Sequence, residues 1–89
     1  MDLPDNKDEL WDFPCDFPLK IMGLAQEQLM LDVLEVIQKH APGDYSPKVK
    51  PSSKGKYHAI TVTITAQNKL QLDNLYRELH ALELVKVLL

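Results

Sequence analysis

The chain has 89 residues, of which 45% are apolar and 26% are charged, and these values are typical of one soluble globular domain. No apolar run approaches the roughly 20 residues of a membrane-spanning helix, so we expect no membrane association. The single cysteine excludes an internal disulfide, and the acidic N-terminus is unlike a targeting peptide, so we expect a cytoplasmic protein.

The net charge of −3 hides an asymmetry along the chain. Residues 1–16 contain six acidic residues and one lysine, a net charge of −5, whereas the remaining residues contain nine basic and seven acidic residues, a net charge of +2. We therefore divide the chain into an acidic, flexible arm, residues 1–12, and a single domain, residues 13–89. The arm is a solvated terminus, a segment that folds back on the basic face of its own domain, or a clip that binds a partner through Trp11 and Phe13.

Two periodic segments open the domain. Residues 17–22, FPLKIM, alternate as a strand with one buried face does, and Lys20 and Met22 fall on the other face. Gly23 is expected to end this strand. Residues 25–40 carry apolar side chains at helical spacing, and the Ala-Pro-Gly that follows them predicts the end of the helix.

The second half of the domain predicts a hairpin, a second helix and a final strand. Residues 45–51 contain two prolines, which indicates an extended edge strand, and residues 52–55, SSKG, are typical of a turn. Residues 56–66 alternate most regularly, with isoleucines and a valine on one face and threonines on the other. Asn68 is expected to cap a helix, and the closing LVKVLL predicts a strand.

The predicted order is therefore strand, helix, strand, strand, helix, strand. Two amphipathic helices and four half-buried strands hide their apolar sides if both helices pack on one face of a four-stranded antiparallel sheet. We therefore predict an α+β fold, a ferredoxin-like βαββαβ sandwich. The other face of the sheet is then open to solvent, with the threonines of residues 56–66 on it.

Three segments carry a resemblance to a known family: HAPGDYSPKVKPSSKGKYHAITVTITA, FPLKIMG and the closing LYRELHALELVKVLL. They resemble the small bacterial YbeD family, whose role is largely uncharacterised, and the similarity extends from about Phe13 to Leu89. The resemblance implies the same βαββαβ fold, similar to the ACT domains that regulate metabolic enzymes. It also implies a cytosolic, non-enzymatic protein with a link to lipoate metabolism, and it supplies no catalytic residue.

The candidate catalytic residues lack the neighbours that catalysis needs. Cys15 is followed by Asp16, whose negative charge disfavours the reactive thiolate. The three histidines are 18 and 22 residues apart, which is not a zinc-binding spacing. The only arginine, Arg77, is expected in the middle of a helix rather than in an anion-binding loop. We therefore expect no enzymatic activity, no metal and no cofactor.

The strongest candidate for binding is the lysine-rich hairpin together with the open face of the sheet. The small residues of the turn are expected to offer N–H groups to an anion, as a nest does. If Val49 points inward, Lys48 and Lys50 join Lys20 on the open face. An alternative interpretation is that lysines and prolines only protect a sheet edge from aggregation. The candidate binding residues are Lys20, Gly23, Lys48, Lys50, Ser52, Ser53, Lys54, Gly55, Lys56 and Tyr57.

These features predict a binding or regulatory module that acts through the open sheet face or the basic hairpin of residues 48–56. The alternative is an ACT-like small-molecule sensor, in which Gly23 lets a ligand approach the backbone. The expected partner is an unidentified protein or a small metabolite. Specific nucleic-acid binding is not expected, because Tyr57 alone is too small a stacking platform. A homodimer is predicted from apolar outer positions of the sheet, among them Leu84 and Leu88.

Overall fold

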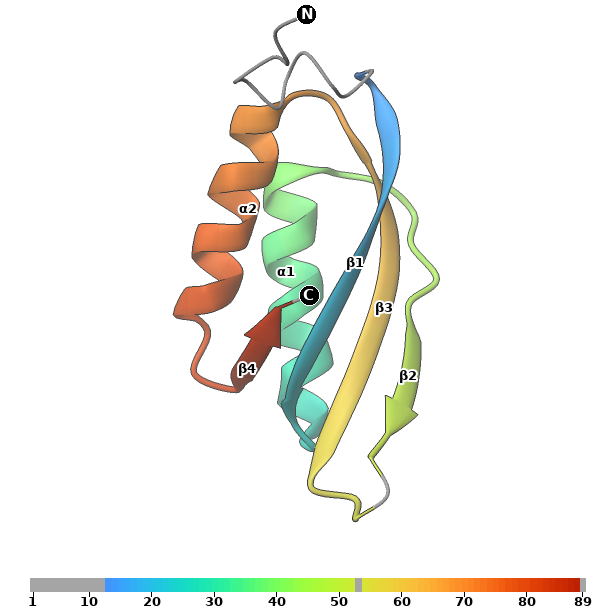
Figure 1. Ribbon diagram of the computed structural model, residues 1–89, viewed down its shortest axis with the longest axis vertical. Coiled ribbons are helices and arrows are strands. Elements are labelled where there is room, and N and C mark those ends of the chain that lie inside the picture. The colour runs from blue at the N-terminus through green and yellow to red at the C-terminus, as the bar shows by residue number, and fades with distance from the viewer. Residues whose placement is uncertain (1–12, 53, 89) are drawn as a thin grey trace, which may run out of the picture.

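The computed structural model describes residues 13–52 and 54–88, so the acidic arm, Ser53 and Leu89 lie outside the described residues. Four strands form one antiparallel sheet in the order β2-β3-β1-β4, and both helices lie on one face of it (Figure 1). The predicted α+β fold with its βαββαβ order is thereby confirmed. The elements are β1 (Cys15–Leu24), α1 (Glu27–His40), β2 (Lys48–Pro51), β3 (Tyr57–Ala66), α2 (Lys69–Ala81) and β4 (Val85–Leu88).

The pairing of β1 with β3 is the longest contact in the sheet. It is continuous from Cys15 opposite Ala66 to Leu24 opposite Tyr57. Because side chains alternate between the two faces of a strand, this register also fixes which residues of both strands face the helices. The strand therefore continues through Gly23, and the prediction that Gly23 ends it is wrong.

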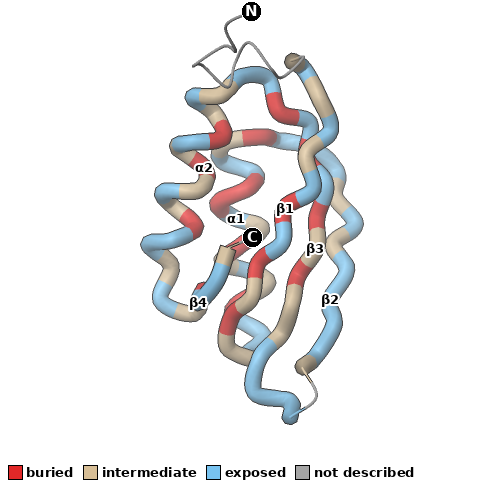
Figure 2. Tube along the Cα trace, viewed as in Figure 1, coloured by how far each residue is buried: buried red, intermediate tan, exposed pale blue. Residues whose placement is uncertain are grey.

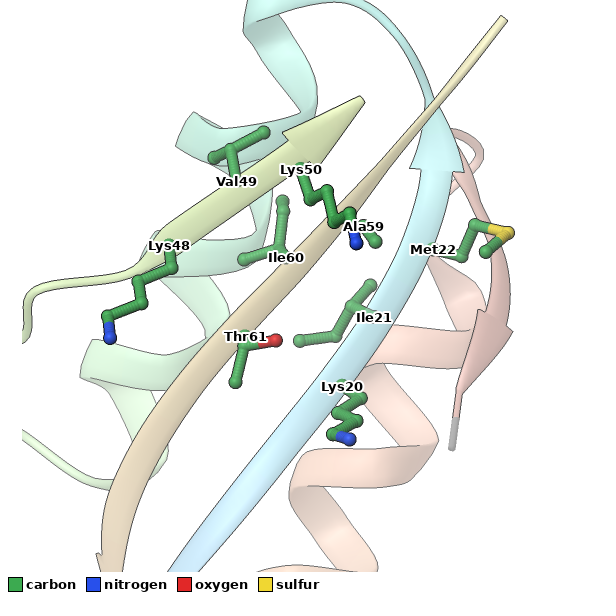
Figure 3. A pocket seen from close by; sticks show the side chains of 9 residues that line it. All are labelled: Lys20, Ile21, Met22, Lys48, Val49, Lys50, Ala59, Ile60 and Thr61. Atoms are coloured by element: carbon green, nitrogen blue, oxygen red, sulfur yellow. The ribbon is translucent and has the colours of Figure 1, made fainter. Parts of the chain in front are cut away.

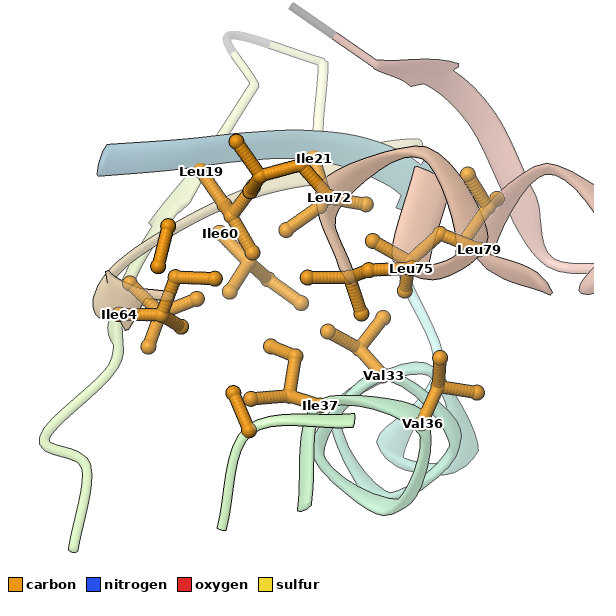
Figure 4. Packing of buried hydrophobic residues seen from close by; sticks show 14 of the residues in the cluster. Leu19, Ile21, Val33, Val36, Ile37, Ile60, Ile64, Leu72, Leu75 and Leu79 are labelled. Atoms are coloured by element: carbon orange, nitrogen blue, oxygen red, sulfur yellow. The ribbon is translucent and has the colours of Figure 1, made fainter. Parts of the chain in front are cut away.

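Buried and exposed positions alternate along β3 as the sequence predicts (Figure 2). Ile60, Val62 and Ile64 are at most 2% exposed, whereas Thr63 and Thr65 are exposed. The buried side chains meet those of both helices in one apolar core (Figure 4). The threonines therefore lie on the face that the helices leave open. The core residues of the two helices are Leu29, Val33, Val36, Ile37, Leu72, Leu75 and Leu79.

Side-chain hydrogen bonds fix the loop that leads from α1 into β2. The Gln38 amide donates to the Gly43 carbonyl at 2.5 Å and accepts from the Gly43 N–H at 3.1 Å. The Tyr45 hydroxyl donates to the Ala41 carbonyl, and the Gln71 side chain donates to the His40 carbonyl at 2.7 Å. These bonds give partners to the carbonyls of His40 and Ala41, which would otherwise be unpaired at the end of α1. The loop therefore has a defined path and places β2 at the edge of the sheet.

The start of α2 is capped as predicted, with one difference. The Asn68 side chain accepts from the Gln71 N–H at 2.8 Å. The return bond of a capping box is expected to link the Gln71 side chain to the Asn68 N–H, but the side-chain Oε1 of Gln71 accepts from the Gln67 N–H at 2.6 Å instead. The cap therefore fixes the chain one residue earlier than the sequence pattern predicts.

An ionic cluster joins the two helices on the outside of the core. The Glu78 carboxylate of α2 accepts a hydrogen bond from Lys39 Nζ at 2.9 Å and a second one from the His40 ring, both on α1. The hydrogen bond from Lys39, and next the one from His40, lower the pKa of Glu78 below its ordinary value. The ionised carboxylate is therefore the form that the folded state favours.

Val62→Ala removes two methyl groups from the middle of the core strand, where the side chain is 2% exposed. We expect the free energy of unfolding to fall by on the order of 1–3 kcal/mol, because transfer and cavity costs add. Urea denaturation measures the change. Thr63→Ala is the matched control on the open face, and its effect should stay within about 0.5 kcal/mol. An equal loss for both variants would mean that the assigned faces of β3 are wrong.

Glu78→Gln should abolish a pH-dependent part of the stability. Since the folded-state pKa of Glu78 lies below its ordinary 4.5, the contribution is present above that value and disappears as the pH falls through the lowered pKa. Wild type should therefore exceed Glu78→Gln in free energy of unfolding near neutral pH, and the two should converge in acid. Urea titrations over a pH series test this. Glu35→Gln, at an exposed glutamate of α1 outside the cluster, is the matched control for the loss of one negative charge. Equal stability of wild type and Glu78→Gln at every pH would show that the cluster contributes nothing.

Candidate binding surface on the open sheet face

The residue pairings place three lysines on the open face of the sheet. Lys20 of β1 and Lys48 of β2 lie opposite Thr61 of β3, one on each side of it. Val49 lies opposite the buried Ile60, so it points to the helix side even though 44% of it is exposed at the sheet edge. The predicted placement of Lys48 and Lys50 beside Lys20 is confirmed.

The next row of the same face is less charged. Ala59 of β3 lies between Met22 of β1 and Lys50 of β2, and Val87 of β4 lies beyond Met22. Directly opposite residues share a face, so all four side chains point away from the helices. The open face therefore combines a row with two lysines and a row with three apolar side chains and one lysine.

A shallow depression of about 440 Å³ follows β3 between these side chains (Figure 3). Its floor is low because β3 contributes the small residues Ala59 and Thr61, whereas longer side chains rise from β1 and β2. A second depression of about 260 Å³ shares Met22, Lys50 and Ala59 with it and extends toward Tyr57. We call this continuous feature the lysine groove. It is formed by Lys20, Met22, Lys48, Lys50, Tyr57, Ala59 and Thr61.

The lysines of the groove have no carboxylate against them within residues 13–52 and 54–88. The ion pairs there join Lys39 and His40 to Glu78, and Lys69 to Asp73, all in the helical layer. On the open face, the Asp16 carboxylate accepts from the Thr65 hydroxyl at 3.4 Å, four residues along β1 from Lys20. Asp44 borders a depression with Lys48, Thr61 and Thr63 but forms no ion pair with that lysine. The groove is therefore a positively charged surface.

The hairpin turn between β2 and β3 uses its own N–H groups. The Ser52 N–H donates to the Tyr57 carbonyl at 2.8 Å, and the Gly55 N–H donates to the Ser52 carbonyl at 3.0 Å. Gly55 has a φ of +72°, which a glycine adopts without strain. Two of the N–H groups assigned to an anion nest are thus engaged within the turn, and that interpretation is wrong for them. Lys54 and Lys56 are exposed at the tip of the hairpin, outside the lysine groove.

Gly23 allows neighbouring parts of the chain to pack closely against it, and it does not expose its backbone to a ligand. It is buried, and a Cβ atom added to it would lie 2.5 Å from Leu29 Cδ1 and 2.5 Å from the Leu84 carbonyl oxygen. The neighbouring Leu24 N–H donates to that same carbonyl at 2.9 Å. The space in front of Gly23 is therefore filled by the chain itself. The expectation that a ligand approaches the backbone at this point is wrong.

Comparison with known proteins places the chain in a family. The family described as "Protein of unknown function (DUF493)" matches residues 8–89. The chain belongs to the DUF493 family. Relatives include the UPF0250 protein plu1293 of Photorhabdus laumondii, 58% identical over 91% of this chain and 93% of the relative, and the UPF0250 protein YE3006 of Yersinia enterocolitica, 57% identical over the same shares. The resemblance to the YbeD family is thereby confirmed.

A solved structure shares the fold of this DUF493 chain. The solution structure of protein HP0495 from H. pylori has a TM-score of 0.78 and covers 100% of this chain and 97% of its own. The sequence identity is 15%, so the likeness concerns the fold alone. It supports the arrangement of two helices on one face and an open sheet on the other.

The described part of the DUF493 chain brings no metal-ligand cluster together. Within it, no three histidine, cysteine, aspartate or glutamate side chains are grouped so as to hold a metal ion. Cys15 is half-buried at the start of β1, and Arg77 is exposed on α2, where it donates to Asn74 at 3.4 Å. Neither α1 nor α2 is long and apolar enough to cross a membrane.

The last strand differs from the sequence-based expectation in register. Leu88 lies opposite the buried Ile21, and Leu84 packs against the core, so neither is an outer position of the sheet. The register shifts between Met22 and Gly23, and this irregularity turns Val87 to the open face, where it is 41% exposed. No local pattern of apolar residues signals such a bulge, because it depends on the pairing with β1.

Gly23→Ala tests the packing around the closed backbone position. The new methyl group would meet a leucine side chain and a backbone carbonyl, and the carbonyl is held by a hydrogen bond and cannot withdraw freely. We expect the free energy of unfolding to fall by about 1–3 kcal/mol, as overpacking typically costs. Urea denaturation measures it, with Ala25→Gly as a control in the loop that follows. An unchanged stability would show that the space beside Gly23 is open.

Proposed function

We propose that this DUF493 chain is a non-enzymatic binding module of the cytoplasm that holds an acidic protein segment on the open face of its sheet. The observation that carries the proposal is the lysine groove. Its three lysines border a floor of small side chains, and no carboxylate of the described residues neutralises them. A basic surface attracts an acidic partner over distance and accelerates its association.

Edge protection does not account for the whole basic surface. Lys48 and Lys50 lie on β2, which is an edge strand, and lysines there do hinder pairing with another sheet. Lys20, however, lies on β1, which is an inner strand of the sheet. β4 pairs with β1 from Ile21 to Gly23, so Lys20 lies next to the last covered position and two strands away from the edge at β2. Protection of the β2 edge therefore does not account for Lys20, which favours a role in binding.

The shape of the groove favours a protein partner over a small metabolite. Small-molecule sites are concave and bury about 70–90% of the ligand surface. The lysine groove lies on a sheet face with β3 as its floor, and its walls are single side chains of β1 and β2. The ACT-like sensor alternative also loses its proposed ligand position, since Leu29 and Leu84 fill the space at Gly23. The resemblance to the YbeD family makes a protein of lipoate metabolism one candidate partner.

A charge-neutralised variant tests the proposed function. Lys48→Gln/Lys50→Gln removes two charges from the groove without burying a polar group. The control Lys69→Gln/Arg77→Gln removes two charges from α2, in the helical layer. After immobilisation, wild type and the control should retain the same acidic protein from a bacterial extract, and the groove variant should lose most of it. The purified partner should then bind with an affinity that falls as salt is added.

The proposal would be contradicted if the groove variant retained the acidic protein as well as wild type does. It would also be contradicted if no protein in the extract bound the control variant more strongly than the groove variant. Nucleic acid recovered in place of a protein would also contradict it. That outcome would show a steep dependence of affinity on salt, because each phosphate contact releases a counterion.

A further inference from the structure

We propose that the segment bound in the lysine groove is an amphipathic α-helix whose apolar stripe is bordered by carboxylates on both sides. This inference rests on the proposed function and specifies its partner. It follows from three properties of the groove: its width, its floor and the position of its charges.

The width of the groove fits a helix better than a strand. Its walls rise from β1 and β2, which lie on either side of β3. Neighbouring strands are about 4.8 Å apart, so the two walls are separated by about 10 Å. An α-helix with its side chains is about 10–12 Å wide, and so it contacts both walls at once. A single extended segment occupies about one strand spacing and reaches only one wall.

The floor of the groove admits a helix at close range. Ala59 and Thr61 project little from β3, so the helix approaches the sheet along this strand. Met22 and Val87 extend the apolar surface toward β4, and Val87 is 41% exposed. An apolar stripe at i, i+3, i+4 and i+7 covers such a surface and removes it from water. The helix would form a third layer, as helices do on both faces of many sheets.

The charges of the groove specify the borders of that stripe. Lys20 lies on one wall, and Lys48 and Lys50 lie on the other (Figure 3). Lysine side chains cover apolar surface with their stems and hold the ammonium group in water. A helix lying between them therefore meets ammonium groups on both flanks. Glutamates on both borders of its apolar stripe would pair with them at the rim of the interface.

Three synthetic peptides of identical composition, each about 20 residues long, separate a helical partner from other acidic partners. The first places glutamates on both borders of an apolar helical stripe. The second keeps the stripe but places all the glutamates on the opposite side of the helix. The third alternates glutamate and apolar residues with the period of a strand. Binding to the 89-residue chain is measured by fluorescence anisotropy of labelled peptides.

We expect the first peptide to bind at least about tenfold more tightly than the other two, because only it pairs both walls while covering the floor. Lys20→Gln alone and Lys48→Gln/Lys50→Gln should each weaken it, whereas Lys69→Gln/Arg77→Gln should not. Backbone amide shifts of β1, β2 and β3 should move on binding, while those of α1 and α2 should change little.

Equal binding of all three peptides would overturn the inference, since charge alone would then decide. Tighter binding of the third peptide would overturn it in favour of an extended partner. If no peptide binds although the extract experiment identifies an acidic protein that needs Lys48 and Lys50, the helical partner is wrong and the proposed function stands. If that experiment also fails, both are wrong.

Discussion

The antiparallel pairing of β1 with β3 is the constraint on which the rest of the molecule depends. Its register runs without interruption from Cys15 opposite Ala66 to Leu24 opposite Tyr57. A slip of one residue would turn every side chain of a strand to the other face. The isoleucines and the valine of β3 would then face water, and its threonines would lie under the helices. The apolar core and the lysine groove are therefore two consequences of the same register, and neither can shift without the other.

Most of the fold follows from patterns within short stretches of the sequence. The alternation of Ile60, Val62 and Ile64 with threonines indicates both the strand and its buried face, because the period of two is local. The two helices carry an equally local signal, and Asn68 marks the start of the second. The placement of Lys48 and Lys50 beside Lys20 required only the parity of each strand and one assumption, the inward direction of Val49.

Two of the features that the sequence did not predict depend on pairs of segments that are distant in the chain. Gly23 is required because Leu29 and Leu84 converge on it from other elements. Val87, and not Leu88, reaches the open face because the register between β1 and β4 shifts. In both cases the residue type was visible in the sequence, but its neighbour was set by tertiary structure. The third unpredicted feature is local, because Ser52 and Tyr57 pair across the hairpin turn and occupy N–H groups there.

Among the described residues, the lysines of the helical layer pair with carboxylates and those of the open sheet face do not, and this difference bears on self-association. In the helical layer, lysines are matched with carboxylates, as Lys39 is with Glu78 and Lys69 with Asp73. On the open face the lysines are not matched within the described residues. Like charges that meet across an interface oppose association, so two copies that stacked their grooves directly would repel each other. The predicted homodimer would therefore require a strand edge or another surface, which leaves the open face available to the acidic partner that we propose.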